Sequence, residues 1–309
     1  MSGSDRSPDV VRTVVVGIDG SPHCADAAVW AAREADRRGH RLRLIEVVEW
    51  QGEVAGHPAA ARAAAQVRAE LRDIARRHVD SAAALVEGRI ATADVSAEVC
   101  EGVPADVLGD VSEVAEMVVL GRPVGGLEGT LLGMALAGRS ACPLVFVSRI
   151  PQAAADAPVV VGIDGSPDSD AALETAFGEA RDRGTYLRVL HAWSDVPLDT
   201  AGGPAIEFGA FSADVREPVY ERVARLASRH PDVEVRHSST RDHPERALRE
   251  LSSDAHLVVI GAGGRSGGLE LGRVGRRLIT TARCPVMVVG PRARARMTSA
   301  LAGDRSSVH

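Results

Sequence analysis

Aromatic residues are scarce in this chain of 309 residues, because Phe, Trp and Tyr together account for only 3% of the sequence. The hydrophobic fraction is 45%, so the core must be built mainly from Val, Leu, Ile and Ala. No apolar run reaches the roughly 18 residues needed to cross a bilayer, and the polar start MSGSDRSPD shows no signal peptide. We therefore expect no association with membranes.

Cysteines are few, and positive charge does not exceed negative charge. The four cysteines show no CxxC spacing, which argues against a structural disulfide or a zinc site and favours the cytoplasm. A net charge of −6 argues against a general nucleic-acid binder. The sequence contains neither GxxxxGKS nor GxxxxGKT, so a P-loop NTPase is excluded.

One stretch occurs twice in the chain. The run VVVGIDGSP covers residues 14–22 and again residues 159–167, at a constant offset of 145 residues (159 − 14). β-branched residues followed by Gly, Asp, Gly, Ser and Pro predict a buried strand that ends in a turn and then a helix. In a chain of 309 residues, the repeat predicts two similar domains.

Each copy alternates strands and helices in the same order. Gly39 and Gly184 are expected to end the first helix of each copy. Five strands joined by helices predict a doubly wound parallel sheet in each copy, which makes the fold two tandem open five-stranded parallel α/β sheets. The expected strands cover 11–18, 42–48, 94–101, 116–121 and 142–147 in the first copy, and 159–163, 187–193, 233–240, 256–261 and 284–289 in the second.

These elements predict the domain boundaries. The first domain covers residues 10–149, the second covers 157–291, and RIPQAAADAP links them. The remaining segment, 292–309, is rich in Ser, Arg and Ala and is expected to be a disordered tail.

A ligand of such a sheet binds beyond the carboxyl ends of its strands. There each copy offers the IDGS turn after its first strand and a glycine loop after its fourth. In the second copy, the backbone of Gly261, Gly264 and Gly272 is suited to a phosphate chain, and Arg265 and Arg273 add positive charge. The alternative is that these glycines only permit a tight turn, and that the aspartates only hold an Asx turn.

The loop of the first copy offers less backbone to a phosphate. Pro123 lacks a backbone donor, and Val124 stands where the second copy has Gly264. We therefore expect binding mainly in the second copy.

Together, these motifs resemble those of the universal stress protein family. VGIDGSP after the first strand and a closing strand that begins with Cys-Pro occur in both halves, and G-x2-G follows the fourth strand of the second half. The resemblance implies a Rossmann-like fold similar to that of the adenine nucleotide alpha hydrolases. ATP-binding members carry G-x2-G-x9-G followed by Ser or Thr. Here Gly264 and Gly272 are separated by seven residues, and Arg273 replaces the hydroxyl residue.

The resemblance implies a site for ATP, with or without Mg. In the second copy the implied binding residues are Ile163, Asp164, Gly165, Ala192, Gly261, Gly264, Arg265, Gly272, Arg273 and Val274. In the first copy they are Asp19, Val47, Gly121, Gly129 and Thr130.

The expected function is that of an ATP-binding stress-response or signalling protein. A scaffold of the same fold that acts through protein partners without a nucleotide is the alternative. We expect no enzyme, or at most slow hydrolysis of bound ATP. His191 and His256 have no neighbouring nucleophile in the sequence and are interpreted as structural.

The closing strands suggest how the two copies associate. In the family, the fifth strands of two domains pair antiparallel. Residues 144–147 and 286–289 are therefore expected to pair within one chain, which gives a pseudo-dimer and covers two apolar edges. A further homodimer of the whole chain is compatible with this arrangement.

Overall fold

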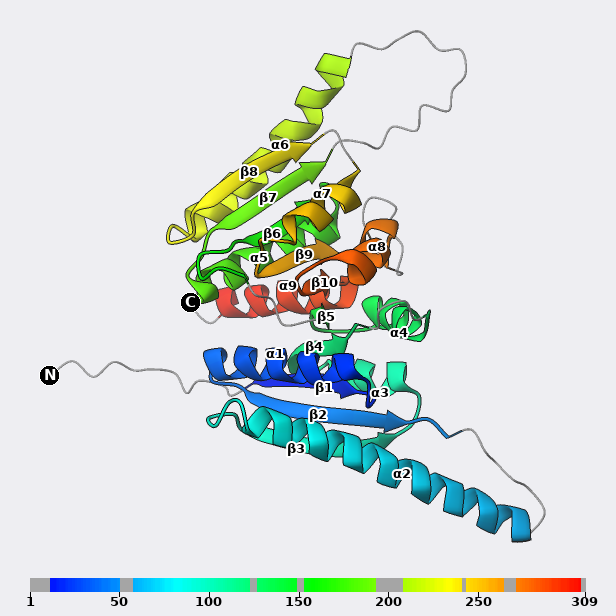
Figure 1. Ribbon diagram of the computed structural model, residues 1–309. Coiled ribbons are helices and arrows are strands. Elements are labelled where there is room, and N and C mark those ends of the chain that lie inside the picture. The colour runs from blue at the N-terminus through cyan, green and yellow to red at the C-terminus, as the bar shows by residue number, and fades with distance from the viewer. Residues whose placement is uncertain are drawn as a thin grey trace, which may run out of the picture. The chain divides into compact units, whose positions relative to one another are not determined.

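The computed structural model describes residues 12–50, 58–122, 127–148, 153–192, 208–240, 243–263 and 271–306. The first copy contains β1 (Thr13–Ile18), α1 (Pro22–Arg38), β2 (Arg41–Val48), α2 (Pro58–Glu87), β3 (Val95–Glu101), α3 (Pro104–Val111), β4 (Ala115–Gly121), α4 (Leu127–Ala137) and β5 (Leu144–Val147). The second contains β6 (Val159–Ile163), α5 (Pro167–Arg183), β7 (Leu187–Ala192), α6 (Phe208–Arg229), β8 (Val235–Thr240), α7 (Pro244–Leu251), β9 (Leu257–Gly261), α8 (Arg273–Thr281) and β10 (Val286–Val289). The helix α9 (Pro291–Ser306) follows (Figure 1).

The chain packs as two units, Met1–Gly121 and Arg122–His309. This division differs from the division by repeat, because α4 and β5 of the first copy pack in the unit that contains the second copy. There α4 contacts α8 and β5 pairs with β10.

The first unit holds four parallel strands in the order β3-β2-β1-β4. Val14, Val15 and Val16 of β1 are at most 1% exposed, because the strand is covered on both sides. α1 and α2 pack against the sheet and against each other. The parallel sheet and its aliphatic core agree with the sequence.

The second unit holds the order β5-β10-β9-β6-β7-β8. All neighbours from β10 to β8 run parallel. β5 and β10 run antiparallel, with Val286 opposite Phe146 and Val288 opposite Leu144. The predicted pairing of residues 144–147 with 286–289 is thus confirmed.

The helix after each IDGS turn begins and ends as its sequence predicts. Ser21 and Ser166 are the N-caps, and their hydroxyl oxygens accept hydrogen bonds from the backbone of Cys24 and Ser169. Gly39 and Gly184 are the C-caps at φ values of 65° and 63°, in the left-handed region that suits glycine. The ends of β1 and β6 are therefore firmly connected to the helices that follow them.

The prediction of a disordered tail is wrong for residues 292–306, which belong to α9. This helix is held to the second unit by specific contacts. Ala293 is 1% exposed, Arg292 Nη1 donates to the Arg139 carbonyl at 2.9 Å, and Arg294 Nη1 lies 2.6 Å from Asp168 Oδ1. Among its described side chains only Ala293 is fully buried, which is why its composition resembles that of an exposed tail.

Candidate functional site

The two IDGS turns have the same backbone geometry. Oδ1 of Asp19 accepts a hydrogen bond from the backbone N–H of Ser21 at 2.9 Å. Oδ1 of Asp164 accepts one from Ser166, also at 2.9 Å. Each aspartate therefore forms an Asx turn, the structural role that the sequence left open beside ligand binding.

The space above the turn is filled in the first copy. Gly20 has φ +71°, and a Cβ built there would lie 2.4 Å from the imidazole Cε1 of His78. The His78 ring, which comes from α2, therefore packs directly against the turn. Its Nδ1 lies 3.0 Å from Oε1 of Glu46 on β2. Burial raises the pKa of Glu46, and its hydrogen bond with His78 opposes that rise.

The described residues leave the corresponding space more open in the second copy. Gly165 has φ +80°, and the nearest atom of the described residues to a Cβ built there is Cγ2 of Val219, at 3.8 Å. Arg222 of α6 approaches from the side: its Nη1 donates to the Gly165 carbonyl at 3.3 Å and to Oδ1 of Asp170 at 2.9 Å. Burial raises the pKa of Asp170, while Arg222 lowers it. The two copies thus share a turn but differ in what covers it.

The first glycine of each loop is required by packing. A Cβ on Gly121 would lie 2.7 Å from the backbone nitrogen of Cys24, and one on Gly261 would lie 2.7 Å from the carbonyl carbon of Asp168. The end of the fourth strand therefore touches the first turn of the helix after the IDGS turn. These glycines have a structural reason that is independent of any ligand.

Asp168 lies at the glycine loop of the second copy, and the sequence analysis did not single it out. Its Oδ2 accepts a hydrogen bond from the backbone N–H of Gly263 at 3.2 Å, and its Oδ1 pairs with Arg294 of α9. The residue is 7% exposed. A protein carboxylate thus binds one amide of the loop that was expected to bind phosphate.

The N-terminus of α8 is the other anion-binding element. Its N-cap is Gly272, which provides no side-chain cap, so the first amides of this helix remain suited to an anion. The amide of Gly272 itself donates to the Ala262 carbonyl at 2.8 Å. Arg273 is the first helical residue; its side chain is 63% exposed and its Nη1 lies 3.2 Å from Oε1 of Glu245. Val274 is half-buried beside it.

The remaining predicted residues lie in four separate places. Ile163 is 7% exposed at the end of β6, and Ala192 ends β7 opposite Thr240. Val47 lies in β2, opposite Cys100. Gly264 and Arg265 lie outside the described residues. Gly129 and Thr130 lie in the first turn of α4, in a different packing unit from Asp19, Val47 and Gly121.

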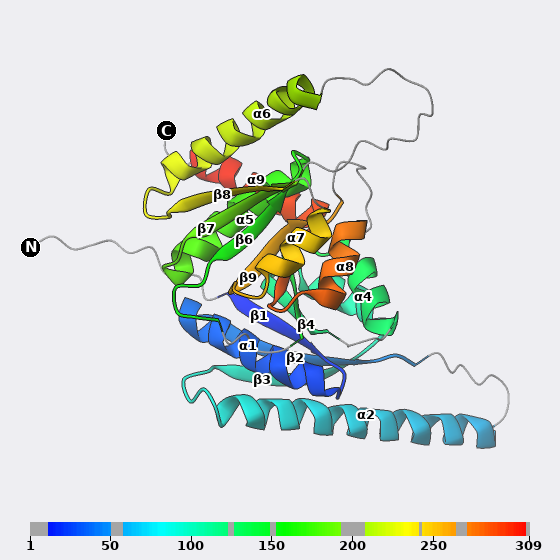
Figure 2. The ribbon, with the colours of Figure 1, turned by 45° about the horizontal axis from the view of Figure 1, so that its top comes forward.

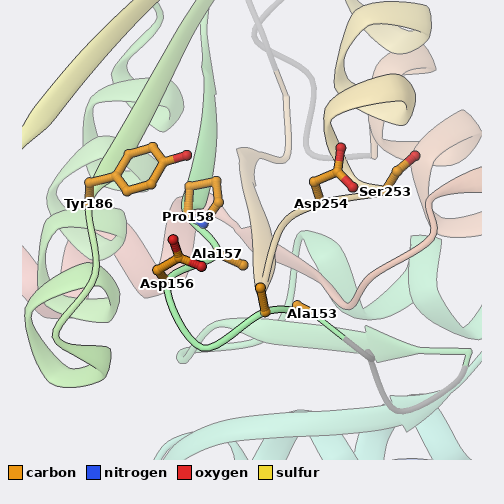
Figure 3. A pocket seen from close by; sticks show the side chains of 8 residues that line it. Ala153, Asp156, Ala157, Pro158, Tyr186, Ser253 and Asp254 are labelled. Carbon is orange, nitrogen blue, oxygen red and sulfur yellow. The ribbon is translucent and has the colours of Figure 1, made fainter.

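A depression of about 250 Å³ lies at the opposite edge of the second unit. Figure 3 shows Pro158 and Tyr186, which directly precede β6 and β7, together with Asp254, which precedes β9. These are the amino ends of the strands, whereas open α/β sheets bind ligands at the carboxyl ends. We therefore assign this depression no role in binding.

Cys284 and His237 show the pKa shifts that burial causes, and no described cluster of these residue types suggests a metal site. All four cysteines are free thiols, and burial raises the pKa of Cys284 to about 12. Burial also lowers the pKa of His237, which packs against Tyr220 at 5.1 Å between ring centroids. Within the described part of the chain, no group of His, Cys, Asp and Glu is arranged to hold a metal ion. No described helix has the length and apolarity that a membrane span needs.

Known proteins share this sequence and fold. The model of the universal stress protein family matches residues 11–148 and again 157–290. Universal stress protein Rv1996 of Mycobacterium tuberculosis is 36% identical over 299 residues, which cover 89% of this chain and 94% of that protein. Rv2005c of the same organism is 36% identical over 287 residues, with 89% and 96% covered.

A solved structure confirms the fold. The crystal structure of a universal stress protein from Archaeoglobus fulgidus matches with a TM-score of 0.60 and 17% identity, and covers 90% of this chain and 98% of that one. Membership of one family accounts for these matches. It also accounts for the repeated turn, the parallel sheets and the paired closing strands. The chain belongs to the universal stress protein family and carries two tandem copies of its domain.

Proposed function

We propose that this chain is a nucleotide-responsive stress or signalling protein that binds one ATP in its second copy. The observation that carries the proposal is the difference between the two turns. His78 covers Gly20 in the first copy, whereas in the second copy the described side chains leave the space above the Gly165 Cα open to 3.8 Å, where Val219 lies, and Arg222 approaches only the Gly165 carbonyl. A purine and ribose need such space beside the first strand.

The charges of the second copy suit the phosphates. The positive end of the α8 dipole and the Arg273 guanidinium lie on the carboxyl-end side of β9. The guanidinium takes the place of the hydroxyl residue found in ATP-binding relatives. The Arg273 side chain remains 63% exposed while it contacts Glu245, so a phosphate can reach the guanidinium.

A specific observation favours the alternative, a scaffold without a nucleotide. The amide of Gly263 is bound by Asp168, and the amide of Gly272 is bound by the Ala262 carbonyl. Two backbone donors of the loop are therefore used by the protein itself. We favour ATP binding because the first-turn amides of α8 receive no side-chain cap.

The first prediction tests this choice with a matched pair of variants. Asp164→Ala and Asp19→Ala remove the same Asx turn from the two copies, so both carry a similar structural cost. We expect Asp164→Ala to weaken ATP binding at least about tenfold, a loss of roughly 1.4 kcal/mol, and Asp19→Ala to leave it unchanged. Isothermal titration calorimetry with ATP measures both.

Two further measurements complete this test. Mass spectrometry of the natively purified protein identifies any nucleotide that it retains. Release of phosphate from bound ATP, which we expect to be slow or absent, is followed in the same preparation. No ATP binding by the wild type would establish the scaffold, and equal losses in both variants would contradict the assignment to the second copy.

A further inference from the structure

The first half of α2 lies outside the core of its own unit. The helix has 30 residues, which corresponds to about 45 Å at 1.5 Å per residue. Its buried side chains are Ala75, Val79, Ala82 and Val86, all in the second half. Every described side chain between residues 59 and 74 is exposed or only half-buried. Figures 1 and 2 both show this end of α2 running past the strands that its other end covers.

This exposed half carries a stripe of large apolar side chains. Val67, Leu71 and Ile74 are 46%, 37% and 40% exposed. Their spacing of four and then three residues is the spacing of a coiled-coil seam, with Leu71 at an a position and Val67 and Ile74 at d positions. About four turns of helix with few buried contacts are only marginally stable in water. Burial of this stripe against another surface would therefore stabilise the first half of α2.

On one side of the stripe, the neighbouring arginines already form ion pairs within the same chain. Arg68, at an e position, forms an ion pair with Glu101 of β3, and Arg72 Nη1 lies 3.4 Å from the same carboxylate. The other flank carries Glu70 and Arg77, both at g positions and both exposed. The stripe is thus accessible from the side on which these two opposite charges lie.

We propose that this stripe, Val67–Leu71–Ile74, binds the same stripe of a second copy of the chain. The two α2 helices run antiparallel about a two-fold axis. Leu71 then packs against the partner's Ile74, and Ile74 against the partner's Leu71. In an antiparallel pair, g positions face g positions, so Glu70 pairs with the partner's Arg77 and Arg77 with the partner's Glu70.

Charge complementarity decides between this arrangement and a parallel one. In a parallel pair, a g position faces an e position of the partner, and Glu70 and Arg77 would then face Ala75 and Ala82 of the partner subunit. These alanines carry no charge and are buried in their own unit. The antiparallel pair satisfies two charges per chain, whereas the parallel pair satisfies none. The seam holds only three large apolar residues per chain, so we expect a weak dimer with a Kd of about 10–100 µM.

The test is a reciprocal charge reversal followed by sedimentation equilibrium up to about 200 µM of full-length protein. Glu70→Arg alone and Arg77→Glu alone each place like charges opposite each other, and each is expected to weaken dimerisation at least tenfold. An equimolar mixture of the two variants restores both opposite-charge pairs, so it is expected to dimerise like the wild type. Asp73→Arg is the matched control, because Asp73 is an exposed acid of α2 outside the seam and its flanks.

A second variant tests the apolar part of the seam. Leu71→Asp is expected to yield a monomer with an unchanged helical circular dichroism spectrum, since Leu71 is exposed and is not among the buried residues of α2. Three outcomes would overturn the proposal: a wild type that stays monomeric throughout, a dimer that persists in Leu71→Asp, or a mixture that does not recover. These outcomes are independent of ATP binding, because Asp164 lies in the other packing unit.

Discussion

Asp168 and Gly261 bring the end of β9 into direct contact with the first turn of α5 at the loop of the second copy. Gly261 lets the end of β9 touch the backbone of Asp168, and the Asp168 carboxylate then reaches both Gly263 and Arg294. A buried carboxylate is stable only when its oxygens are paired. At this position one carboxylate connects α5, the loop after β9, and α9.

At this scale we predict that Gly261→Ala destabilises the protein by about 1–3 kcal/mol. A Cβ at this position meets backbone atoms of Asp168 at 2.7–2.9 Å, and the backbone cannot rotate away as a side chain can. Urea unfolding monitored by circular dichroism measures the change.

The control for this prediction is Gly178→Ala. Gly178 lies within α5, and a Cβ built there meets no atom within 4 Å. Alanine at that position is expected to stabilise the helix by about 0.5–1 kcal/mol. An unchanged midpoint for Gly261→Ala would show that the close approach is relieved at little cost.

Among the elements, α9 departs most from what its sequence indicates. It starts immediately after β10, and Arg292 and Arg294 attach it to Arg139 and Asp168. The helix therefore forms part of the second unit, and one of its charges is connected to the candidate ligand loop.

We predict that Arg294→Gln lowers the free energy of unfolding by about 1–2 kcal/mol, because it leaves the buried Asp168 carboxylate with one partner fewer. Denaturant unfolding near pH 7 measures the loss. Arg276→Gln, at an exposed arginine of α8, is the control and is expected to have little effect. The double variant Asp168→Asn/Arg294→Gln is expected to lose less than the sum of the two single losses, and additive losses would exclude a coupled pair.

The sequence predicts the central elements well and the peripheral ones poorly, for physical reasons. β1 and β6 follow from β-branched runs that end at Gly-Asp-Gly-Ser, and Gly39 and Gly184 end their helices through local backbone geometry. The docking of α9 depends on Arg294 meeting a carboxylate that lies 126 residues earlier in the chain. No local pattern contains such a contact. The candidate site divides in the same way: the Asx turns are local, whereas the packing of His78 on Gly20 is long-range.

At the scale of the whole molecule, β5 connects the two sequence repeats. It is encoded by the first copy, yet its hydrogen-bonded partner β10 belongs to the second. Val286, Met287, Val288 and Val289 of β10 are all at most 1% exposed. An uncovered strand edge with such residues is prone to pair with another chain.

We therefore predict that the second copy alone, residues 157–306, dimerises or aggregates in solution. Without β5, the edge of β10 is uncovered, and two copies can pair there antiparallel. Light scattering coupled to gel filtration measures the mass. The control is the full-length chain at about 1 µM, below the Kd expected for the α2 contact, which retains β5 and is expected to be monomeric. A stable monomer of residues 157–306 would show that β5 is not needed to cover this edge.

The covering of one turn by His78 has a consequence for how such a protein can evolve. In a dimer of identical chains, any substitution that closes one binding site also closes the other. Here both turns are encoded separately in one polypeptide, so His78 can occlude the first without affecting the second. Fusion thereby allows the two duplicated halves to diverge: one half can specialise for structure while the other keeps the proposed nucleotide site, which would give one ligand per chain.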